Sequence, residues 1–241
     1  MKVFRPGADA RLDGEAPNGR GDEVPLSSAR TYIAGSIAGI VFDLDNTLYT
    51  NPSYAKFQED VLVGRLGSEL GLSAEAAAQL VAGLRAERRA TGLPPTSLGN
   101  LSATLGFDIE TSVRWREECI EPAAWLRRDP RLGEALRRLA GRFALAVVSN
   151  NPRLVIEKSL QALEVSDHFQ VLVGLDDTLK SKPATEPFAF ALRLLQLGPE
   201  ACLSIGDRFD VDIAPALELG MNGILVSGVE DVYGLPELLS L

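Results

Sequence analysis

Short apolar runs alternate with segments of helical spacing along most of the chain after residue 130. These runs, together with one earlier run, predict strands at 40–42, 143–148, 170–173, 201–205 and 223–226. The segments between them repeat apolar residues at helical intervals and predict helices at 131–140, 152–163, 187–197 and 213–219. Strands that alternate with helices form parallel βαβ units. The pattern therefore predicts an α/β fold with a doubly wound parallel sheet, a fold that places ligands at the carboxyl ends of its strands.

Between residues 51 and 125 the pattern is helical throughout. Helical spacing and a high content of Ala, Leu, Glu and Arg mark the segments 54–70, 74–88 and 111–120. Ser73 is placed to cap the second of these helices, and Gly92-Leu93-Pro94-Pro95 separates two helical portions. Because β-branched alternation is scarce here, we expect an all-helical insert at 51–125 that divides the α/β core into 31–50 and 126–241.

The first 30 residues show no periodicity and are rich in Gly, Pro, Asp and Arg. A segment of this composition buries too little apolar surface to form a core. We expect residues 1–30 to be a disordered extension outside the folded domain.

The balance of charge limits the kinds of partner. The chain has 241 residues, of which 46% are hydrophobic and 24% charged, as is usual for a globular protein in water. Its 24 basic and 33 acidic residues give a formal net charge of −9. Nucleic acid is not an expected partner, because binding to its phosphates requires clustered Lys and Arg. An anionic substrate would need a local cationic site on this acidic protein.

Three further absences narrow the class of protein. Cys119 and Cys202 form no CxxC pair, so neither a disulfide framework nor a zinc site is expected. No apolar run approaches the roughly 18 residues that span a bilayer, so we expect no membrane association. The N-terminus has no basic stretch followed by an apolar one. We expect a cytoplasmic protein.

The apolar run at 40–42 ends at two aspartates, Asp43 and Asp45, which are separated by one residue. Carboxylates at the edge of a buried sheet are costly unless something neutralises them, most simply a metal ion. The preference of Asp for turns after strands is enough to explain an isolated pair. The functional alternative makes Asp43 a carboxylate nucleophile and Asp45 a general acid and then a general base. Thr47, two residues later, would serve the turn.

Polar residues also follow the second and third of the predicted strands. Ser149-Asn150-Asn151-Pro152 reads as an ordinary helix start, and the same arrangement can hold an anion at a helix N-terminus. Lys182, next to Pro183, would supply the cation that an anionic substrate needs, although most lysines are simply solvated.

The fourth predicted strand runs into Gly206-Asp207. Asp207 is a candidate metal ligand, because with Asp43 it could present hard oxygen atoms to Mg²⁺. Asp212 lies in the first turn of the following helix, where the helix dipole alone favours an acidic residue.

Taken together, these strand ends resemble the motifs of the haloacid dehalogenase-like (HAD) hydrolase superfamily. The family pattern is Asp-x-Asp-x-Thr, then Ser or Thr, then Lys, then Gly-Asp with a second Asp five residues further on. In this chain the matching residues are Asp43-Leu44-Asp45-Asn46-Thr47, Ser149, Lys182, and Gly206-Asp207 with Asp212. The resemblance covers residues 38–228. About 100 residues separate Asp45 from Ser149, which in this family places a substrate-selecting helical cap between the first and second motifs.

The resemblance implies a Rossmann-like core and an aspartyl-phosphate mechanism. Asp43 would attack phosphorus, and Asp45 would protonate the leaving alcohol and later activate water. Ser149, Asn150 and Lys182 would hold the phosphoryl oxygens.

The resemblance also implies a magnesium cofactor. The ion would lie between Asp43, the backbone carbonyl of Asp45, and Asp207. Asp212 would bind it through water or would position Lys182.

We therefore expect a magnesium-dependent phosphatase that hydrolyses a small phosphorylated metabolite, whose identity the sequence does not specify. A sugar phosphomutase of the same superfamily shares all four motifs and remains an alternative. A non-catalytic binding module on the same scaffold is a second alternative. Loss of Asp43 or Asp45 would be the usual sign of such a module, and this chain has both. A dehalogenase lacks the second acid, so Asp45 argues against that activity.

Overall fold

The computed structural model describes residues 1–7, 21–25, 37–92 and 97–241 of the chain. The chain divides into two compact units. The core unit comprises Met1–Thr50 and Leu126–Leu241, and the helical unit comprises Asn51–Trp125.

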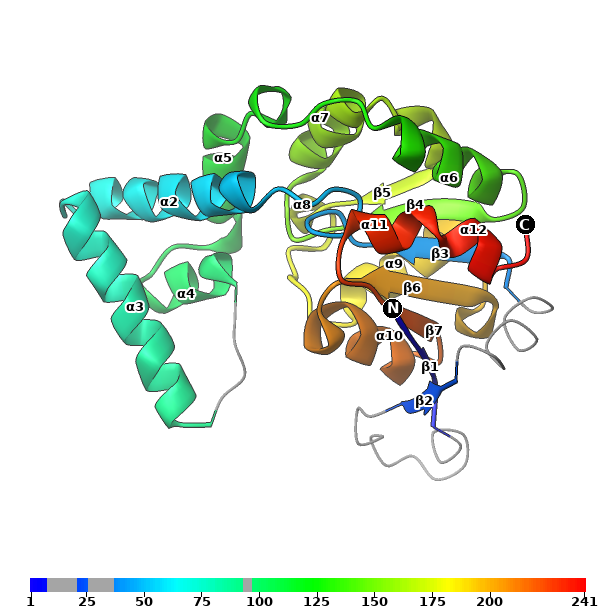
Figure 1. The fold of residues 1–241 in the computed structure, drawn as a ribbon. Coiled ribbons are helices and arrows are strands. Elements are labelled where there is room, and N and C mark those ends of the chain that lie inside the picture. The colour runs from blue at the N-terminus through cyan, green and yellow to red at the C-terminus, as the bar shows by residue number, and fades with distance from the viewer. Residues whose placement is uncertain (8–20, 26–36, 93–96) are drawn as a thin grey trace. The chain divides into compact units, whose positions relative to one another are not determined.

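The core unit is built on a single sheet, in which the described residues supply seven strands in the order β2-β1-β7-β6-β3-β4-β5 (Figure 1). The strands are β1 Lys2–Arg5, β2 Asp22–Val24, β3 Gly39–Phe42, β4 Ala144–Val148, β5 Val171–Val173, β6 Cys202–Gly206 and β7 Asn222–Leu225. β3 pairs in parallel with both β4 and β6, and β5 and β7 extend the parallel sheet on either side. The predicted α/β fold with a parallel sheet is therefore confirmed.

Helices cover both faces of this sheet. They are α6 Pro130–Ala140, α7 Arg153–Leu163, α8 Leu175–Thr178, α9 Glu186–Leu195, α10 Ala214–Glu218, α11 Val229–Tyr233 and α12 Leu235–Leu238. In Figure 1, α6 and α7 lie over one face, and α9 and α10 lie over the other. On the α9 side, Val41, Ala146 and Val173 share one buried cluster with Phe188 and Ala191. Burial from both sides explains why the central strands read as continuous apolar runs instead of alternating ones.

The N-terminal segment departs from the sequence-based expectation. The prediction that residues 1–30 are disordered is wrong for β1 and β2, because both strands belong to the sheet; 8–20 and 26–30 lie outside the described residues. β1 runs antiparallel to β7, with Val3 opposite Ile224. A four-residue strand is too short to show a period, and its partner lies at the other end of the chain.

Side-chain contacts support this N-terminal pairing. Val3 is 1% exposed, and Phe4 lies in a buried cluster with Ile213 and Leu217. Charged side chains on the two N-terminal strands form ion pairs, Lys2 with Glu23 at 3.0 Å and Arg5 with Asp22 at 3.6 Å. The N-terminal strands thus extend the folded core.

The helical unit contains α2 Pro52–Glu69, α3 Ala74–Ala90, α4 Leu98–Thr104, α5 Ile109–Cys119 and a 3₁₀ turn at Pro122–Ala124. Ser73 caps α3 as predicted, because its side chain accepts a hydrogen bond from the Ala76 N–H. The short helix α4 was not predicted, although Ser97 caps it in the same way. The predicted break at 92–95 falls largely outside the described residues. Among the helices that the structure describes, none has both the length and the apolar character needed to cross a lipid bilayer.

The two ends of the helical unit are fastened to each other. The Asn51 side chain caps α2 by accepting from the Tyr54 N–H at 3.0 Å, and its Nδ2 donates to the Trp125 carbonyl at 3.2 Å. The Trp125 ring stacks on the Tyr54 ring, with centroids 5.8 Å apart. The insert therefore begins and ends at adjacent points.

Substitution of Val3 tests whether β1 contributes to the folded core. Val3→Ala should lower the free energy of unfolding by about 2 kcal/mol, because it removes buried methyl groups between packed neighbours. Lys2→Ala on the same strand is the control and should change it by less than about 0.5 kcal/mol, since the Lys2 ion pair is exposed. Urea denaturation followed by circular dichroism measures both values. An unchanged stability in Val3→Ala would show that β1 is dispensable.

Candidate active site

The carboxyl ends of three adjacent parallel strands bring the candidate residues together. Asp43 follows β3, and its N–H donates to the Ile205 carbonyl of β6 at 2.8 Å. Ser149 follows β4, and its N–H donates to the Val173 carbonyl of β5 at 3.0 Å. Because each residue continues a backbone ladder, its position is set by the register of the sheet.

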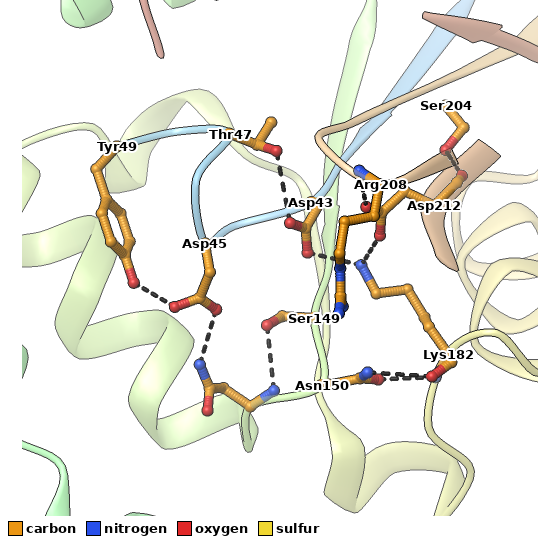
Figure 2. A network of polar contacts seen from close by, with 11 residues as sticks. Asp43, Asp45, Thr47, Tyr49, Ser149, Asn150, Lys182, Ser204, Arg208 and Asp212 are labelled. Atoms are coloured by element: carbon orange, nitrogen blue, oxygen red, sulfur yellow. Dashed lines mark hydrogen bonds and ion pairs between the residues drawn. The ribbon is translucent and has the colours of Figure 1, made fainter. Parts of the chain in front are cut away.

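Lys182 is the cation of this site. Its side chain is almost completely buried, and Nζ donates to Asp43 Oδ1 and to Asp212 Oδ1, each at 2.6 Å (Figure 2). Burial alone would lower the pKa of Lys182, but the carboxylates of Asp212 and Asp43 outweigh that effect and raise it. Lys182 therefore remains charged and supplies the local positive charge that the acidic composition called for.

Asp43 lies among several charges. Its Oδ1 accepts from Lys182, and its Oδ2 accepts from the Thr47 hydroxyl at 3.5 Å. Burial raises the pKa of Asp43 to about 7, although the nearby Lys182 ammonium lowers it. The lysine therefore compensates only in part for placing this carboxylate inside the protein.

Asp43, Asp207 and Asp212 form an acidic cluster suited to a metal ion. Each offers one carboxylate oxygen, and these oxygens lie within 4.8 Å of one another. Burial and the charge of Asp212 raise the pKa of Asp207. Lys182 contacts two of these three carboxylates and offsets only part of their negative charge. A hard divalent cation would therefore improve the balance of charge. The donor set fits Mg²⁺, which is held by few carboxylates and keeps several waters.

Asp45 has different surroundings from Asp43. The turn that carries both residues is closed by the Leu48 N–H donating to the Leu44 carbonyl at 2.9 Å. Asp45 Oδ2 accepts from Asn151 Nδ2 at 2.9 Å. Asp45 Oδ1 accepts from the Tyr49 hydroxyl (Figure 2). The structure thus gives two aspartates that are two residues apart separate sets of partners.

Tyr49 and Asn151 were not among the predicted site residues. Tyr49 ends the run Asp43–Tyr49, and Asn151 directly follows the predicted pair Ser149-Asn150. Nearness in sequence was the available signal, but nothing in the sequence shows that both side chains converge on Asp45.

The polar residues after β4 are engaged within the protein. Ser149 is buried, and its Oγ accepts from the Asn151 N–H at 3.1 Å. The Asn150 side chain forms two hydrogen bonds with the main chain of Lys182: Oδ1 accepts from its N–H at 2.7 Å, and Nδ2 donates to its carbonyl at 3.2 Å. The Asn150 amide, expected to contact phosphate, therefore fixes the backbone that carries Lys182.

Asp212 lies in a π-helical turn at Phe209–Ile213, which extends the predicted helix towards β6. It is 1% exposed, and its Oδ2 accepts from the Arg208 N–H at 3.1 Å while its carbonyl accepts from the Ser204 hydroxyl at 2.7 Å. A Cβ at Gly206 would lie 2.3 Å from the Asp212 Cβ, so only glycine fits there.

Substitution of Gly206 tests this close contact. Gly206→Ala should lower the free energy of unfolding by about 1–3 kcal/mol, because the added methyl group overlaps Asp212. Gly133→Ala is a matched control in helix α6, where a Cβ meets nothing within 4 Å. It should raise stability by about 0.5–1 kcal/mol through its helix propensity. Thermal and urea unfolding distinguish the two signs, and equal effects would contradict the close contact.

Comparison with known proteins places this arrangement in a family. The family model described as haloacid dehalogenase-like hydrolase matches residues 37–220. A glyceraldehyde 3-phosphate phosphatase from Methanothermobacter thermautotrophicus is 27% identical over 202 residues, covering 79% of this chain and 86% of that protein. A phosphoglycolate phosphatase from Salmonella choleraesuis is 28% identical over 200 residues, covering 75% and 78%.

Solved structures support the fold. The crystal structure of a HAD phosphatase from Thermococcus onnurineus superimposes with a TM-score of 0.59 at 17% identity and covers 84% of this chain and 98% of that one. The family model spans most of the chain, including every motif on which the sequence resemblance rested. The resemblance is confirmed, and the chain belongs to the haloacid dehalogenase-like hydrolase family.

Proposed function

We propose that this hydrolase is a magnesium-dependent phosphatase that cleaves a small phosphorylated metabolite through an aspartyl-phosphate on Asp43. One observation carries the proposal: Asp43 lies in the charged cluster of Lys182, Asp207 and Asp212, whereas Asp45 is held by the neutral donors Tyr49 and Asn151. Two neighbouring carboxylates in unlike environments suit two chemical roles.

The carboxylates of Asp43 and Asp207 and the backbone carbonyl of Asp45 would hold the magnesium ion, with Asp212 close by. When bound, the ion would offset the negative charge on the phosphoryl oxygens and on the attacking carboxylate.

Lys182 and Ser149 would bind the phosphoryl group. An ammonium group has three N–H donors, and Asp43 and Asp212 use two of them, which leaves one for a phosphoryl oxygen. Ser149 Oγ accepts from the Asn151 N–H, so the hydroxyl still has its own proton to donate. Fixed donors of this kind stabilise charge without reorganising during the reaction.

Asp43 and Asp45 would carry out the chemistry. An Asp43 carboxylate oxygen forms a bond to phosphorus while the bond from phosphorus to the leaving oxygen breaks, and Asp45 transfers its proton to that oxygen. Asp45, now ionised, takes a proton from water as the water oxygen bonds to phosphorus. The bond between Asp43 and phosphorus then breaks and inorganic phosphate leaves, so both aspartates return to their starting forms.

The helical unit would act as the substrate-selecting cap. It is inserted between Asp45 and Ser149 and is compact in itself. Two relatives, the glyceraldehyde 3-phosphate phosphatase and the phosphoglycolate phosphatase, support a small phosphorylated metabolite as the substrate. The presence of both Asp43 and Asp45 does not favour a non-catalytic module, and no contact described above favours a phosphomutase.

Removal of the metal tests the cofactor. Excess EDTA should abolish hydrolysis of p-nitrophenyl phosphate, and added Mg²⁺ should restore it, because the acidic cluster requires a cation to bind a phosphate ester. Mg²⁺ should also raise the melting temperature, since a ligand that binds the folded state stabilises it. Asp207→Asn should need a higher Mg²⁺ concentration for both effects. Undiminished turnover in EDTA would contradict the proposal.

Separate substitutions of the two aspartates test the division of roles. Asp43→Asn should lower kcat by at least about 10³-fold, because the nucleophile is lost. Asp45→Asn should lower it by about 10²–10⁴-fold and should release one equivalent of p-nitrophenol in a burst, since water activation is lost while attack continues. Mass spectrometry should then find one phosphoryl group on Asp43. Turnover by Asp43→Asn at the normal rate would rule out the mechanism.

A further inference from the structure

Both carboxylate oxygens of Asp45 are held by donors from different parts of the chain. The Tyr49 hydroxyl donates to Oδ1 (Figure 2). Asn151 Nδ2 donates to Oδ2 at 2.9 Å. Tyr49 belongs to the same turn as Asp45, whereas Asn151 follows strand β4, more than a hundred residues later. The contacts therefore fix the carboxylate from two sides.

The two donors are themselves fixed. Tyr49 is 6% exposed, and its backbone forms an isolated bridge with Asp45. Asn151 is 7% exposed, its N–H donates to Ser149 Oγ at 3.1 Å, and its carbonyl accepts from the Leu175 N–H at 3.0 Å. Side chains held in this way can orient a neighbour without moving themselves.

Neutral donors have a specific consequence for Asp45. The charged cluster of Lys182 lies close by, and an unrestrained Asp45 carboxylate two residues from Asp43 would be attracted to that ammonium. Tyr49 and Asn151 satisfy the Asp45 oxygens without adding a charge. These two contacts therefore orient the Asp45 carboxylate without adding a charge beside it.

The neighbouring asparagine has a different partner. Asn150 holds the main chain of Lys182, at 2.7 and 3.2 Å, while Asn151 holds the carboxylate of Asp45. Two adjacent asparagines thus hold different parts of the proposed site: Asn150 holds the phosphoryl-binding Lys182, and Asn151 holds the general acid Asp45.

We propose that Tyr49 and Asn151 are positioning residues that aim Asp45 at the leaving-group oxygen. This inference rests on the proposed phosphatase function, because it assigns Asp45 the transfer of a proton to that oxygen. A small displacement of a catalytic group costs up to about 10²-fold in rate. The cost should appear only when the leaving group needs the proton.

Two aryl esters with unlike leaving groups separate this role from a merely structural one. Phenolate is a poor leaving group and needs protonation, whereas 2,4-dinitrophenolate leaves readily without it. Asn151→Ala and Tyr49→Phe should lower kcat/KM for phenyl phosphate on the order of 10- to 100-fold. For 2,4-dinitrophenyl phosphate they should lower it by less than about threefold.

Asn150→Ala is the matched control. It should lower kcat/KM for both esters by similar factors, because Lys182 contacts the phosphoryl group that the two esters share. Tyr49→Phe removes a single oxygen atom, so it keeps the test decisive if Asn151→Ala fails to fold. Crystal structures of the two variants provide a second measurement: the Asp45 side chain should leave its single position while the Lys182 contacts persist.

The outcomes separate the inference from the function beneath it. Equal losses on both esters in Asn151→Ala and Tyr49→Phe, or no loss on either, would overturn the positioning role alone. An unsubstituted protein that hydrolyses neither ester in the presence of Mg²⁺ would overturn the phosphatase proposal and this inference together.

Discussion

The site depends on one buried ammonium group, Nζ of Lys182, which bonds to Asp43 and Asp212 at 2.6 Å each. Charges taken out of water are stable only when they are paired and hydrogen-bonded. Much of the local structure maintains this pairing: Asn150 fixes the Lys182 main chain, and Gly206 leaves room for Asp212. Ion pairs of Lys182 therefore connect the segments that follow the strands, in addition to the backbone hydrogen bonds of the sheet.

Around this lysine the site separates into a charged part and a neutral part. Asp43 shares its cluster with Asp207 and Asp212, so its surroundings suit metal and phosphate. Asp45 has hydroxyl and amide partners, and neither of these adds a charge. Two carboxylates on one short turn thus have different surroundings, because the fold brings different neighbours to each.

The sequence predicts the parallel sheet and the four strand-end motifs because these features are local, an apolar run followed by polar residues. It predicts less where distant segments meet. β1 pairs with β7 at the far end of the chain, and Asn151 reaches Asp45 only through the register of β4 beside β3. The contact of Asn150 with the Lys182 main chain was missed for the same reason. The contact of Tyr49 with Asp45 lies within one turn, but the sequence does not show which way the tyrosine side chain points.

The hydrogen bond from the Asn51 side chain to the Trp125 carbonyl holds the two ends of the helical unit together. An insert whose two ends meet occupies a single point of the scaffold, so changes in its length or sequence need not strain the strands on either side. Asp45 lies before this point and Ser149 well after it, and neither residue belongs to the helical unit. The length and sequence of the helical unit can therefore change while Asp45 and Ser149 keep their places in the core unit.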